Sequence, residues 1–410
     1  MKKKILIVSP KFPYPTNGAC ELDRATGIEL LVKLGHEVQV VTKVYDEERG
    51  RAAQAVGERL GFVVVPVPYK YLHPVSSAQK VWYAVKRIIR TWYLDGAAFE
   101  YSEPEIQTKL QQTLNSFQPD SVWFDYTYLW PLYHMVRARR IPIVTRSINF
   151  EPTHFLEEDG RSFVNYLKFL PKVLSEYTVV RGSDFIFAIT PKEAGIYKKL
   201  GARNVAVLPL RGLTNCLLDP VPVKESSTLN VFFSGSTYNV VHNRKALEFI
   251  LTQIIPETQK QFPGQFRFHI FGGKVPPSFD TYFGVDVIKH GFLASEEFGR
   301  LMHTMDIAIA PSLYGAGMQQ KIFEPLARGL PTVTSPRGLA GYPFKDQEHL
   351  LLANSYADFV RSLGLLRDIT LRRKLSDNAH QLAATLFSES VIVGKITSAL
   401  HSVIKPVSDI

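Results

Sequence analysis

The sequence predicts an α/β protein made of two doubly wound parallel sheets, and three observations lead to this fold class. Short β-branched apolar runs alternate with segments of helical spacing, a pattern typical of parallel strands joined by crossover helices. The alternation breaks once, at residues 216–228, where CLLDPVPVKESST brings prolines and a polar cluster. The length of 410 residues accommodates two or three domains.

These observations predict the domain organisation. We expect a first domain at residues 1–215, a linker at residues 216–228 and a second domain at residues 229–387. A C-terminal helical segment is expected at residues 388–410.

The first domain begins with a buried strand at residues 4–9, followed by a loop, a helix at residues 22–34 and a strand at residues 37–42. Further strands are expected at residues 62–67, 121–124, 141–145, 184–190 and 205–208. Ligands of such sheets bind beyond the carboxyl ends of the strands. The loop with Gly18 is therefore expected at a binding site, although it lacks the G-x-G-x-x-G dinucleotide fingerprint.

Polar side chains follow two other strands of this domain and should share one rim with the Gly18 loop. They are Asp125, Tyr126, Arg146, Asn149, Glu151 and His154. We expect this rim to line a binding site. A single histidine in a loop is either a proton-transfer group or an ordinary surface residue, so both interpretations of His154 stay open.

Residues 80–93, KVWYAVKRIIRTWY, predict a basic amphipathic helix. One face carries Val81, Val85, Ile88 and Trp92. The other carries Lys80, Lys86, Arg87 and Arg90. Such a helix either lies on an anionic membrane surface or packs against a core with a basic outer face.

The second domain repeats the alternation. Strands are expected at residues 229–234, 266–271, 286–289 and 307–310, and helices at residues 244–262, 295–303 and 319–328. A final helix is expected at residues 391–403.

The most informative stretch is DIAIAPSLYGAGMQQKIFEPLARGLPTVTS, residues 306–335, which predicts a strand, a glycine loop, a helix and a second strand. The first amides of such a helix attract anions. Lys321 lies in the first turn, where a cation is unfavourable for the helix dipole, and this suggests an external negative charge. Glu324, one turn further along the same face, can accept hydrogen bonds from hydroxyl groups.

The motif Gly315-Ala316-Gly317, Lys321, Glu324, Ala327, Gly329, Pro331 resembles the donor-site signature of family 4 glycosyltransferases. The resemblance implies a GT-B fold, with two Rossmann-like domains facing across a cleft and a C-terminal helix, residues 388–410, that crosses back onto the first domain. It also implies that Glu324 holds the ribose of a nucleotide, and that the glycine loop and Lys321 meet the diphosphate and the sugar. An ordinary strand-to-helix connection with an exposed Lys and Glu is the alternative.

Other segments carry the resemblance further. The first loop keeps Gly18 of the family pattern P-x-P-x-x-x-G-G, and Gly235 with Asn243 matches a second family segment. The resemblance implies these donor-binding residues: Gly18, Gly235, Arg244, Gly272, Phe292, Gly315, Gly317, Met318, Gln319, Lys321 and Glu324. The chain departs from the family at Ala316, where an acidic residue is more usual, and at Gln319 and Ser236, where an arginine is more usual. The resemblance also implies that the rim of the first domain carries the acceptor site, with Asp125, Tyr126, Arg146, Asn149, Glu151 and His154 on the acceptor side. His154, Lys321 and Glu324 are the candidates for catalysis.

Composition limits the partners and the compartment. The net charge of +10 favours acidic partners such as a nucleotide or an anionic lipid surface. Zinc-finger spacing and RNP-type strand motifs are missing, so nucleic acid is not expected as a partner. Only two cysteines, Cys20 and Cys216, are present, which favours a reducing, cytoplasmic location. The apolar run at the N-terminus is too short for a signal peptide, so any work at the membrane is expected from its surface.

The predicted function is that of a retaining glycosyltransferase. It would move a hexosyl unit from a nucleoside-diphosphate sugar to a saccharide, lipid-linked or glycolipid acceptor in cell-surface polysaccharide or glycolipid synthesis. The sequence lacks a D-x-D metal motif, so we expect a metal-independent reaction without a cofactor. A non-catalytic nucleotide-sugar-binding or assembly protein and a nucleotide-sugar epimerase stay open as alternatives.

Overall fold

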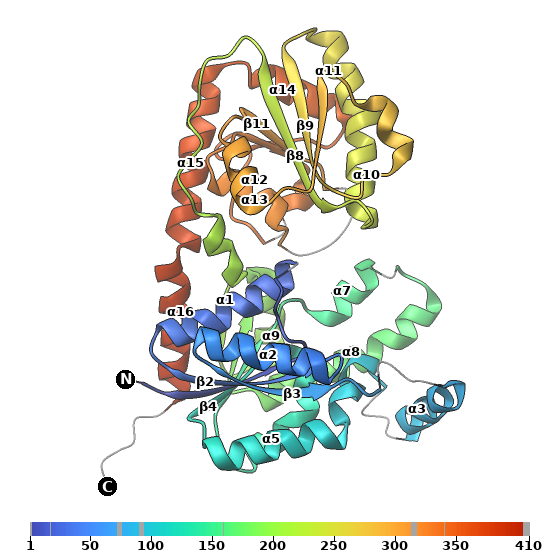
Figure 1. Ribbon diagram of the computed structural model, residues 1–410, viewed down its shortest axis with the longest axis vertical. Helices are drawn as coiled ribbons and strands as arrows, with labels where there is room; N and C mark the ends of the chain where they lie inside the picture. The colour runs from blue at the N-terminus through green and yellow to red at the C-terminus, as the bar shows by residue number, and fades with distance from the viewer. Residues whose placement is uncertain are drawn as a thin grey trace. The chain divides into compact units, whose positions relative to one another are not determined.

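The computed structural model describes residues 2–16, 18–71, 76–89, 94–158, 160–312, 318–339 and 341–404. The chain divides into two compact units, which we describe separately. Unit 1 comprises residues 1–212 and 392–410, and unit 2 comprises residues 213–391. Each unit contains one parallel sheet with helices on its faces (Figure 1).

Unit 1 is built on a seven-stranded parallel sheet with the order β3-β2-β1-β4-β5-β6-β7. Its strands are β1 (Lys4–Ser9), β2 (Glu37–Val44), β3 (Val63–Pro68), β4 (Ser121–Phe124), β5 (Ile143–Arg146), β6 (Phe185–Ala188) and β7 (Val205–Val207). In the register, Ile7 of β1 lies opposite Val40 of β2 and Trp123 of β4. These central strands are apolar throughout because both faces of the sheet are covered.

The helices of unit 1 are set by local capping. They are α1 (Ala19–Lys33), α2 (Glu47–Leu60), α3 (Ser77–Ile89), α4 (Gly96–Phe99), α5 (Pro104–Phe117), α6 (Tyr133–Arg137), α7 (Glu151–Glu158), α8 (Phe163–Gly182), α9 (Pro191–Lys199) and α16 (Glu389–Val403). Asp46 accepts a hydrogen bond from the Arg49 amide at 2.7 Å and so caps α2, which ends at the left-handed Gly61 (φ 85°). Ser162 and Thr190 cap α8 and α9 in the same way.

Unit 2 has a six-stranded sheet with the order β10-β9-β8-β11-β12-β13. The strands are β8 (Leu229–Thr237), β9 (Phe266–Gly273), β10 (Val287–Gly291), β11 (Ile307–Ala310), β12 (Thr332–Thr334) and β13 (Leu351–Leu352). The helices around it are α10 (Val241–Phe249), α11 (Ile255–Gln261), α12 (Ser295–Met302), α13 (Gln320–Ala327), α14 (Tyr356–Leu365) and α15 (Ile369–Phe387).

The single helix predicted at residues 244–262 is divided in the structure. A π-helical turn, Ile250–Ile254, separates α10 from α11. Pro256 lies in the first turn of α11, and a proline without an amide hydrogen cannot continue the regular hydrogen-bond ladder. The helical segment is therefore irregular next to this proline.

Helices α15 and α16 contain the described segment, Ile369–Val403, that is long and apolar enough to cross a membrane by length and composition. Its apolar side chains belong to the two cores. Leu375 packs in the core of unit 2, whereas Ile392, Ile396 and Leu400 pack in the core of unit 1 with β1 and β2. A buried core helix meets the same criterion, so the segment is weak evidence for a membrane span.

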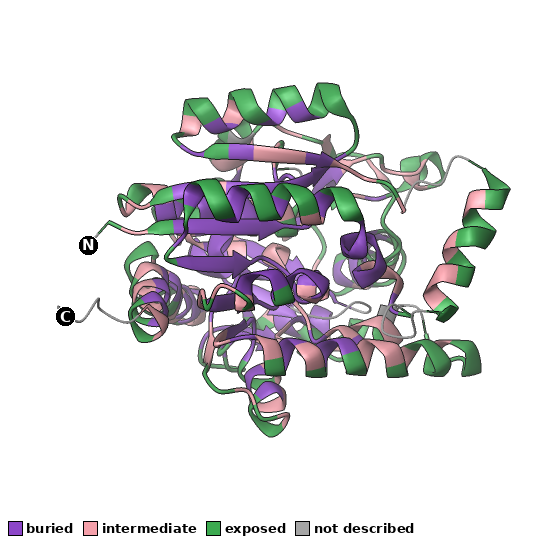
Figure 2. Cartoon of the chain, turned by 90° about the horizontal axis from the view of Figure 1, so that it is seen from below, coloured by how far each residue is buried: buried purple, intermediate pink, exposed green. Residues whose placement is uncertain are grey.

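Helix α3 differs from the other helices because none of its 13 residues is buried. Figure 2 shows it exposed along its length, whereas the central strands are buried. The core-facing interpretation of this helix is therefore wrong for residues 77–89, where no residue is buried, although the half-buried Tyr83 packs against Tyr71 and Phe99. Arg90 and Trp92 of the predicted helix lie outside the described residues.

The strand order creates a switch point in each sheet. In unit 1, β1 pairs with β2 on one side and with β4 on the other. In unit 2, β8 lies in the same way between β9 and β11. The connections that leave the two inner strands turn in opposite directions, and ligands of open α/β sheets bind in the crevice so formed at the carboxyl ends.

Candidate functional site

Helix α13 follows β11 at the switch point of unit 2 and carries Lys321 and Glu324. The Lys321 ammonium donates a hydrogen bond to Oδ1 of Asn243 at 3.1 Å. Asn243 lies on α10, which follows β8. The hydrogen bond therefore joins the two connections that diverge from the switch point. Asn243 is part of the segment that resembles the family pattern, but the sequence did not indicate that it meets Lys321.

The Lys321 ammonium is a buried cation with a neutral partner. Burial lowers its pKa to about 8. Within the described parts of the chain it forms no ion pair, and the amide oxygen of Asn243 is its hydrogen-bond acceptor. A cation in this situation is stabilised when an anion binds next to it. The first turn of α13 is thus prepared for an anionic ligand.

Glu324 lies one turn further along α13. Burial raises the pKa of its carboxyl group, although Arg328 opposes this effect. No side chain or amide of the described residues donates a hydrogen bond to this carboxyl group. Its oxygens are therefore available to accept hydrogen bonds from the hydroxyl groups of a ligand.

Two predicted glycines, Gly235 and Gly272, bring the ends of β8 and β9 into contact. Gly272 has a φ of 131°, and a Cβ atom there would lie 1.7 Å from the carbonyl oxygen of Gly235. No other residue fits this position. Phe292, just after β10, is 79% exposed. An open aromatic ring therefore lies near the end of the sheet, where it can stack on a planar ligand.

The other predicted donor residues have different environments. Met318 is buried, and Gln319 is the N-cap residue of α13, with its Oε1 atom 3.3 Å from the Ser312 hydroxyl. Arg244 is exposed in the first turn of α10. Gly315, Ala316 and Gly317 lie outside the described residues.

Of the predicted cationic donor residues in unit 2, Lys321 is thus largely buried, whereas Arg244 lies at the surface. In the part of the chain that the structure describes, no group of three or more His, Cys, Asp or Glu side chains could hold a metal ion.

At the switch point of unit 1, Gly18 is the exposed N-cap residue of α1. A Cβ atom there would come within 2.8 Å of Oε2 of Glu21, which pairs with Lys11 at 3.2 Å. A glycine at this position keeps the start of α1 open.

Asp125 and Arg146 belong to a buried ion cluster with Asp23 and Arg211. The guanidinium of Arg211 lies 2.7 Å from Asp23 and 2.9 Å from Asp125. Arg146 lies 3.4 Å from Asp23. Although burial opposes ionisation, the two arginines hold the pKa of Asp23 well below its usual range. Asp125 and Arg146 are at most 1% exposed, so we assign them to shaping the rim and not to direct contact with a ligand.

Tyr126 and Glu151 are close together on the same rim. The Tyr126 hydroxyl donates to Glu151 at 2.5 Å, and Lys172 of α8 lies 3.7 Å from the same carboxylate. Asn149 and His154, which precede and follow Glu151, are half-buried. The structure therefore brings four of the six predicted acceptor-side residues to one partly accessible place.

Glu176 was not predicted but lies directly behind this rim. Its carboxyl group accepts hydrogen bonds from the hydroxyls of Thr127 at 2.9 Å and Tyr197 at 2.8 Å. Burial raises its pKa to about 8, so it is largely protonated at neutral pH. Its position in the middle of α8 carries no signal in the sequence, because its partners come from distant segments.

Two family models match most of the chain. The model described as "Glycosyl transferase 4-like domain" matches residues 28–211, and the model described as "Glycosyl transferases group 1" matches residues 228–367. A search of the curated proteins gives no match.

Solved structures show the same two-unit architecture, known as GT-B. Sucrose-phosphate synthase from Thermosynechococcus elongatus is 12% identical, with a TM-score of 0.65 over 98% of this chain and 99% of that one. HepE of Anabaena in complex with UDP and glucose is 14% identical, with a TM-score of 0.60 over 98% and 100%. A glycosyltransferase from Rickettsia africae is 12% identical, with a TM-score of 0.65 over 98% and 99%.

Proposed function

Because the chain belongs to the group 1 glycosyltransferases, we propose that it moves a hexosyl unit from a nucleoside-diphosphate sugar to a saccharide, lipid-linked or glycolipid acceptor. Unit 2 would bind the donor and unit 1 the acceptor. The structures of HepE of Anabaena with UDP and with UDP-glucose support this class of donor. Such acceptors belong to the synthesis of cell-surface polysaccharide or glycolipid.

The observation that carries the proposal is the buried Lys321 ammonium at the switch point of unit 2. A departing nucleoside diphosphate gains negative charge in the transition state, and fixed cations and amides placed there lower the barrier. Lys321 would supply the buried charge and Arg244 a second charge at the surface. Glu324 would accept hydrogen bonds from the ribose, and Phe292 would stack on the base.

The family resemblance implies retention of the anomeric configuration without an enzymic nucleophile. In this mechanism the bond between the anomeric carbon and the diphosphate breaks, and the departing phosphate takes the proton of the acceptor hydroxyl as the new glycosidic bond forms. His154, Glu151 and Asn149 would hold the acceptor hydroxyl in position. We propose that the fixed cations do the work that a divalent ion does in other transferases, so activity should persist in EDTA.

Calorimetric titration with UDP, ADP and GDP tests donor binding, and NMR of the product formed from the matching sugar nucleotide and an acceptor tests the reaction. We expect micromolar binding of at least one of the nucleoside diphosphates. In the product, the anomeric configuration of the new glycosidic bond should be the same as that of the sugar in the donor. Binding without transfer or donor hydrolysis would instead identify a non-catalytic binding protein, an alternative suggested by Ala316, Gln319 and Ser236. A changed sugar in the absence of acceptor would identify an epimerase.

We further propose that α3 docks the enzyme on an anionic membrane from the cytoplasmic side, next to a lipid-linked acceptor. Its exposed apolar side chains are Val81, Trp82, Val85, Ile88 and Ile89. Lys80, Lys86 and Arg87 lie on the same helix, and residues 77–89 contain no acid. An exposed apolar face with flanking cations suits the interface of an anionic bilayer.

Helix α8 supports the same proposal. It exposes a stripe of apolar side chains, Phe163, Leu167, Leu170, Leu174 and Tyr177. Lys172 of α8 pairs at 3.4 Å with Asp95, which follows the α3 segment, so both helices belong to one region of unit 1. An exposed apolar surface of this extent marks an interaction site, and the lysines on it favour a negatively charged partner.

A further inference from the structure

Arg24 of α1 is a buried guanidinium that the mechanism above does not use. Its side chain is only 6% exposed. Its Nε atom has no hydrogen-bond partner, and among the described residues no carboxylate lies within ion-pair distance of it. Buried charges in proteins are normally paired, so an unpaired arginine at such a depth requires an explanation.

The position of Arg24 is that of a ligand group. It lies in the second turn of α1, which follows β1, and its guanidinium lies 5.8 Å from the ring centre of Tyr126, which follows β4. Strands β1 and β4 form the switch point of unit 1. Arg24 therefore lies between the two diverging connections, where an α/β sheet binds its ligand. Lys321 likewise lies at the switch point of unit 2.

Phenol rings form the wall beside Arg24. Tyr126 and Tyr128 have their ring centres 4.2 Å apart, and Tyr128 stacks on Tyr101 at 5.6 Å. Burial alone would lower the pKa of Arg24, but the neighbouring phenols and Asp125 raise it. The guanidinium thus stays charged. The guanidinium lies over the Tyr126 ring, and an aromatic wall next to a fixed cation suits a sugar ring that carries an anionic group.

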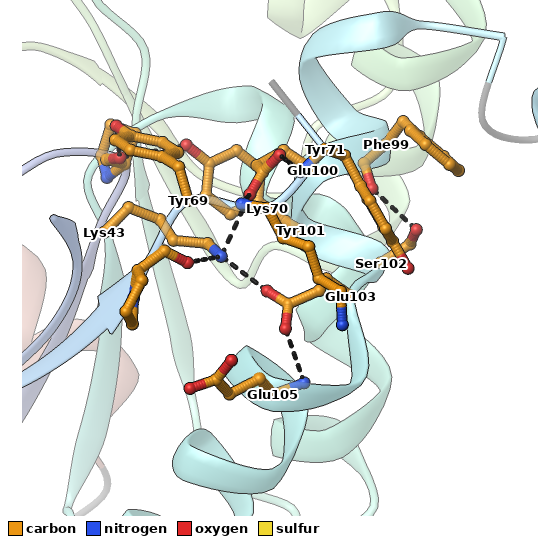
Figure 3. Close-up of polar contacts among 12 residues, drawn as sticks. Lys43, Tyr69, Lys70, Tyr71, Phe99, Glu100, Tyr101, Ser102, Glu103 and Glu105 are labelled. Atoms are coloured by element: carbon orange, nitrogen blue, oxygen red, sulfur yellow. Dashed lines mark hydrogen bonds and ion pairs between the residues drawn. The ribbon is translucent and has the colours of Figure 1, made fainter. Parts of the chain in front are cut away.

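The wall is held in place by a second buried network (Figure 3). The Lys43 ammonium, which is fully buried, lies 3.1 Å from Glu100 and 2.6 Å from Glu103. Glu100 and Glu103 flank Tyr101 and its neighbour in the chain. The Tyr69 and Tyr101 hydroxyls both donate to the Pro10 carbonyl, at 2.6 and 3.1 Å. The rings therefore have little freedom to move away from the site.

The carboxylates around Arg24 already have cations. Asp125 pairs with Arg211, and Asp23 pairs with Arg211 and Arg146. Glu151 contacts Lys172 and the Tyr126 hydroxyl. None of these acids needs Arg24 for its charge, so the guanidinium keeps its donors for a ligand.

We propose that Arg24, with the rings of Tyr126 and Tyr128, binds an anionic group, phosphate or carboxylate, on the acceptor. The proposal rests on the proposed function and makes it more specific: the acceptor is an acidic saccharide or a sugar phosphate and not a neutral sugar. Tyr126 would then connect two tasks, since its ring faces Arg24 and its hydroxyl holds Glu151.

Three variants test the site. Arg24→Met keeps the length and the packing but removes the charge and the donors, whereas Arg24→Lys keeps the charge. Arg51→Met is the matched control, because it removes an exposed guanidinium from α2 of the same unit. Thermal unfolding of each variant checks that it folds. If Arg24→Met does not fold, Arg24→Lys and wild-type selectivity still decide the question.

Binding is measured first, with inorganic phosphate, glucose 1-phosphate and glucuronate as anionic probes and methyl glucoside as the neutral probe. Each is titrated into a Lys321→Ala background, so that the anion site of unit 2 does not contribute. For the anionic probe that binds wild type best, we expect Arg24→Met to lower the affinity by tenfold or more, the scale of lost charge-assisted hydrogen bonds. Arg51→Met should change nothing. Tighter binding of the phosphate probes than of glucuronate would identify phosphate as the group recognised, and tighter binding of glucuronate would identify carboxylate.

Kinetics with intact Lys321 then separate this proposal from the proposed function. Arg24→Met should raise KM for an anionic acceptor by tenfold or more, leave donor affinity and donor hydrolysis unchanged, and leave KM for a neutral acceptor unchanged. Equal KM values for Arg24→Met and wild type, or a wild-type preference for neutral acceptors, would overturn the anionic site while transfer itself persists. Failure of wild type to bind any nucleoside diphosphate would instead overturn the proposed function.

Discussion

Lys321 is the residue on which donor activation depends. Replacing it with alanine removes the buried cation of α13, and we expect turnover to fall by a factor of roughly a hundred or more, the scale of a lost preorganised charge contact. Lys374→Ala on α15 is the control, since Lys374 is exposed. Steady-state transfer assays measure both variants, and wild-type turnover in Lys321→Ala would refute the role of this ammonium.

The same ammonium predicts a pH dependence. Its pKa in the free protein is lowered to about 8, and a bound diphosphate would raise it again. Below pH 8 the cation is already present. Above pH 8 binding must take up a proton, so affinity falls as pH rises, by at most about tenfold per pH unit. Calorimetry of UDP binding between pH 7 and 9.5 measures this, and Lys321→Ala should show a flat profile.

Glu324 should act on binding more than on folding. Its carboxyl group has no hydrogen-bond donor among the described residues, so Glu324→Ala removes no internal contact of this kind. We expect nucleotide affinity to fall by about tenfold, the value of one or two hydrogen bonds to a charged group. Wild-type affinity in the variant, measured by calorimetry with an unchanged melting temperature, would contradict the assignment.

The sequence could predict some of the site residues but not others. Lys321 and Glu324 stand within one short helix, so their spacing alone places them on one face. Asp125 and Arg146 could not be judged in this way. Their partners, Arg211 and Asp23, are 86 and 123 positions away in the chain. Only the fold shows that these charges form ion pairs with one another inside unit 1.

The proposed membrane docking of α3 can be tested by a substitution in this helix. Ile88 is 66% exposed on this helix, and Ile88→Asp places an acid in its apolar face. We expect the variant to lose most of its binding to vesicles that contain anionic lipid, because an acid in the interface is costly and repelled.

Co-sedimentation measures this binding, with Leu365→Asp on α14 as the matched control for an exposed leucine, 52% accessible. If the same amount of wild-type protein sediments with anionic and with neutral vesicles, the docking proposal is wrong.

Elements with a strong local pattern were predictable. The apolar runs of β1, β8 and β11 lie where the sequence places them, since strands buried on both faces leave a clear signal. Three features were not. The π-helical turn before Pro256 depends on local hydrogen bonding, the exposure of α3 depends on the absence of a covering element, and Glu176 depends on contacts from other segments.

In the molecule as a whole, the buried ion cluster stabilises unit 1. It connects α1, β5 and the segments after β4 and β7 through Asp23 and Arg211. Asp23→Asn leaves two buried arginines short of a counter-charge, so we expect a loss of about 3–5 kcal/mol in the free energy of unfolding.

Urea denaturation followed by far-UV circular dichroism measures this loss. Glu47→Gln, which affects an exposed pair with Arg51, should cost less than about 1 kcal/mol. Equal stability of the two variants would show that the cluster is not needed for folding.

Because α16 is part of the core of unit 1, the folding of unit 1 depends on the order in which the chain is synthesised. Ile392, Ile396 and Leu400 complete the core around β1 and β2, yet they leave the ribosome after all of unit 2. Domains usually fold as soon as they emerge, but here residues 1–212 must wait with part of their core uncovered. Unit 2 can therefore finish folding before unit 1, although most of unit 1 is translated first, and residues 1–212 need protection from aggregation until α16 has been released.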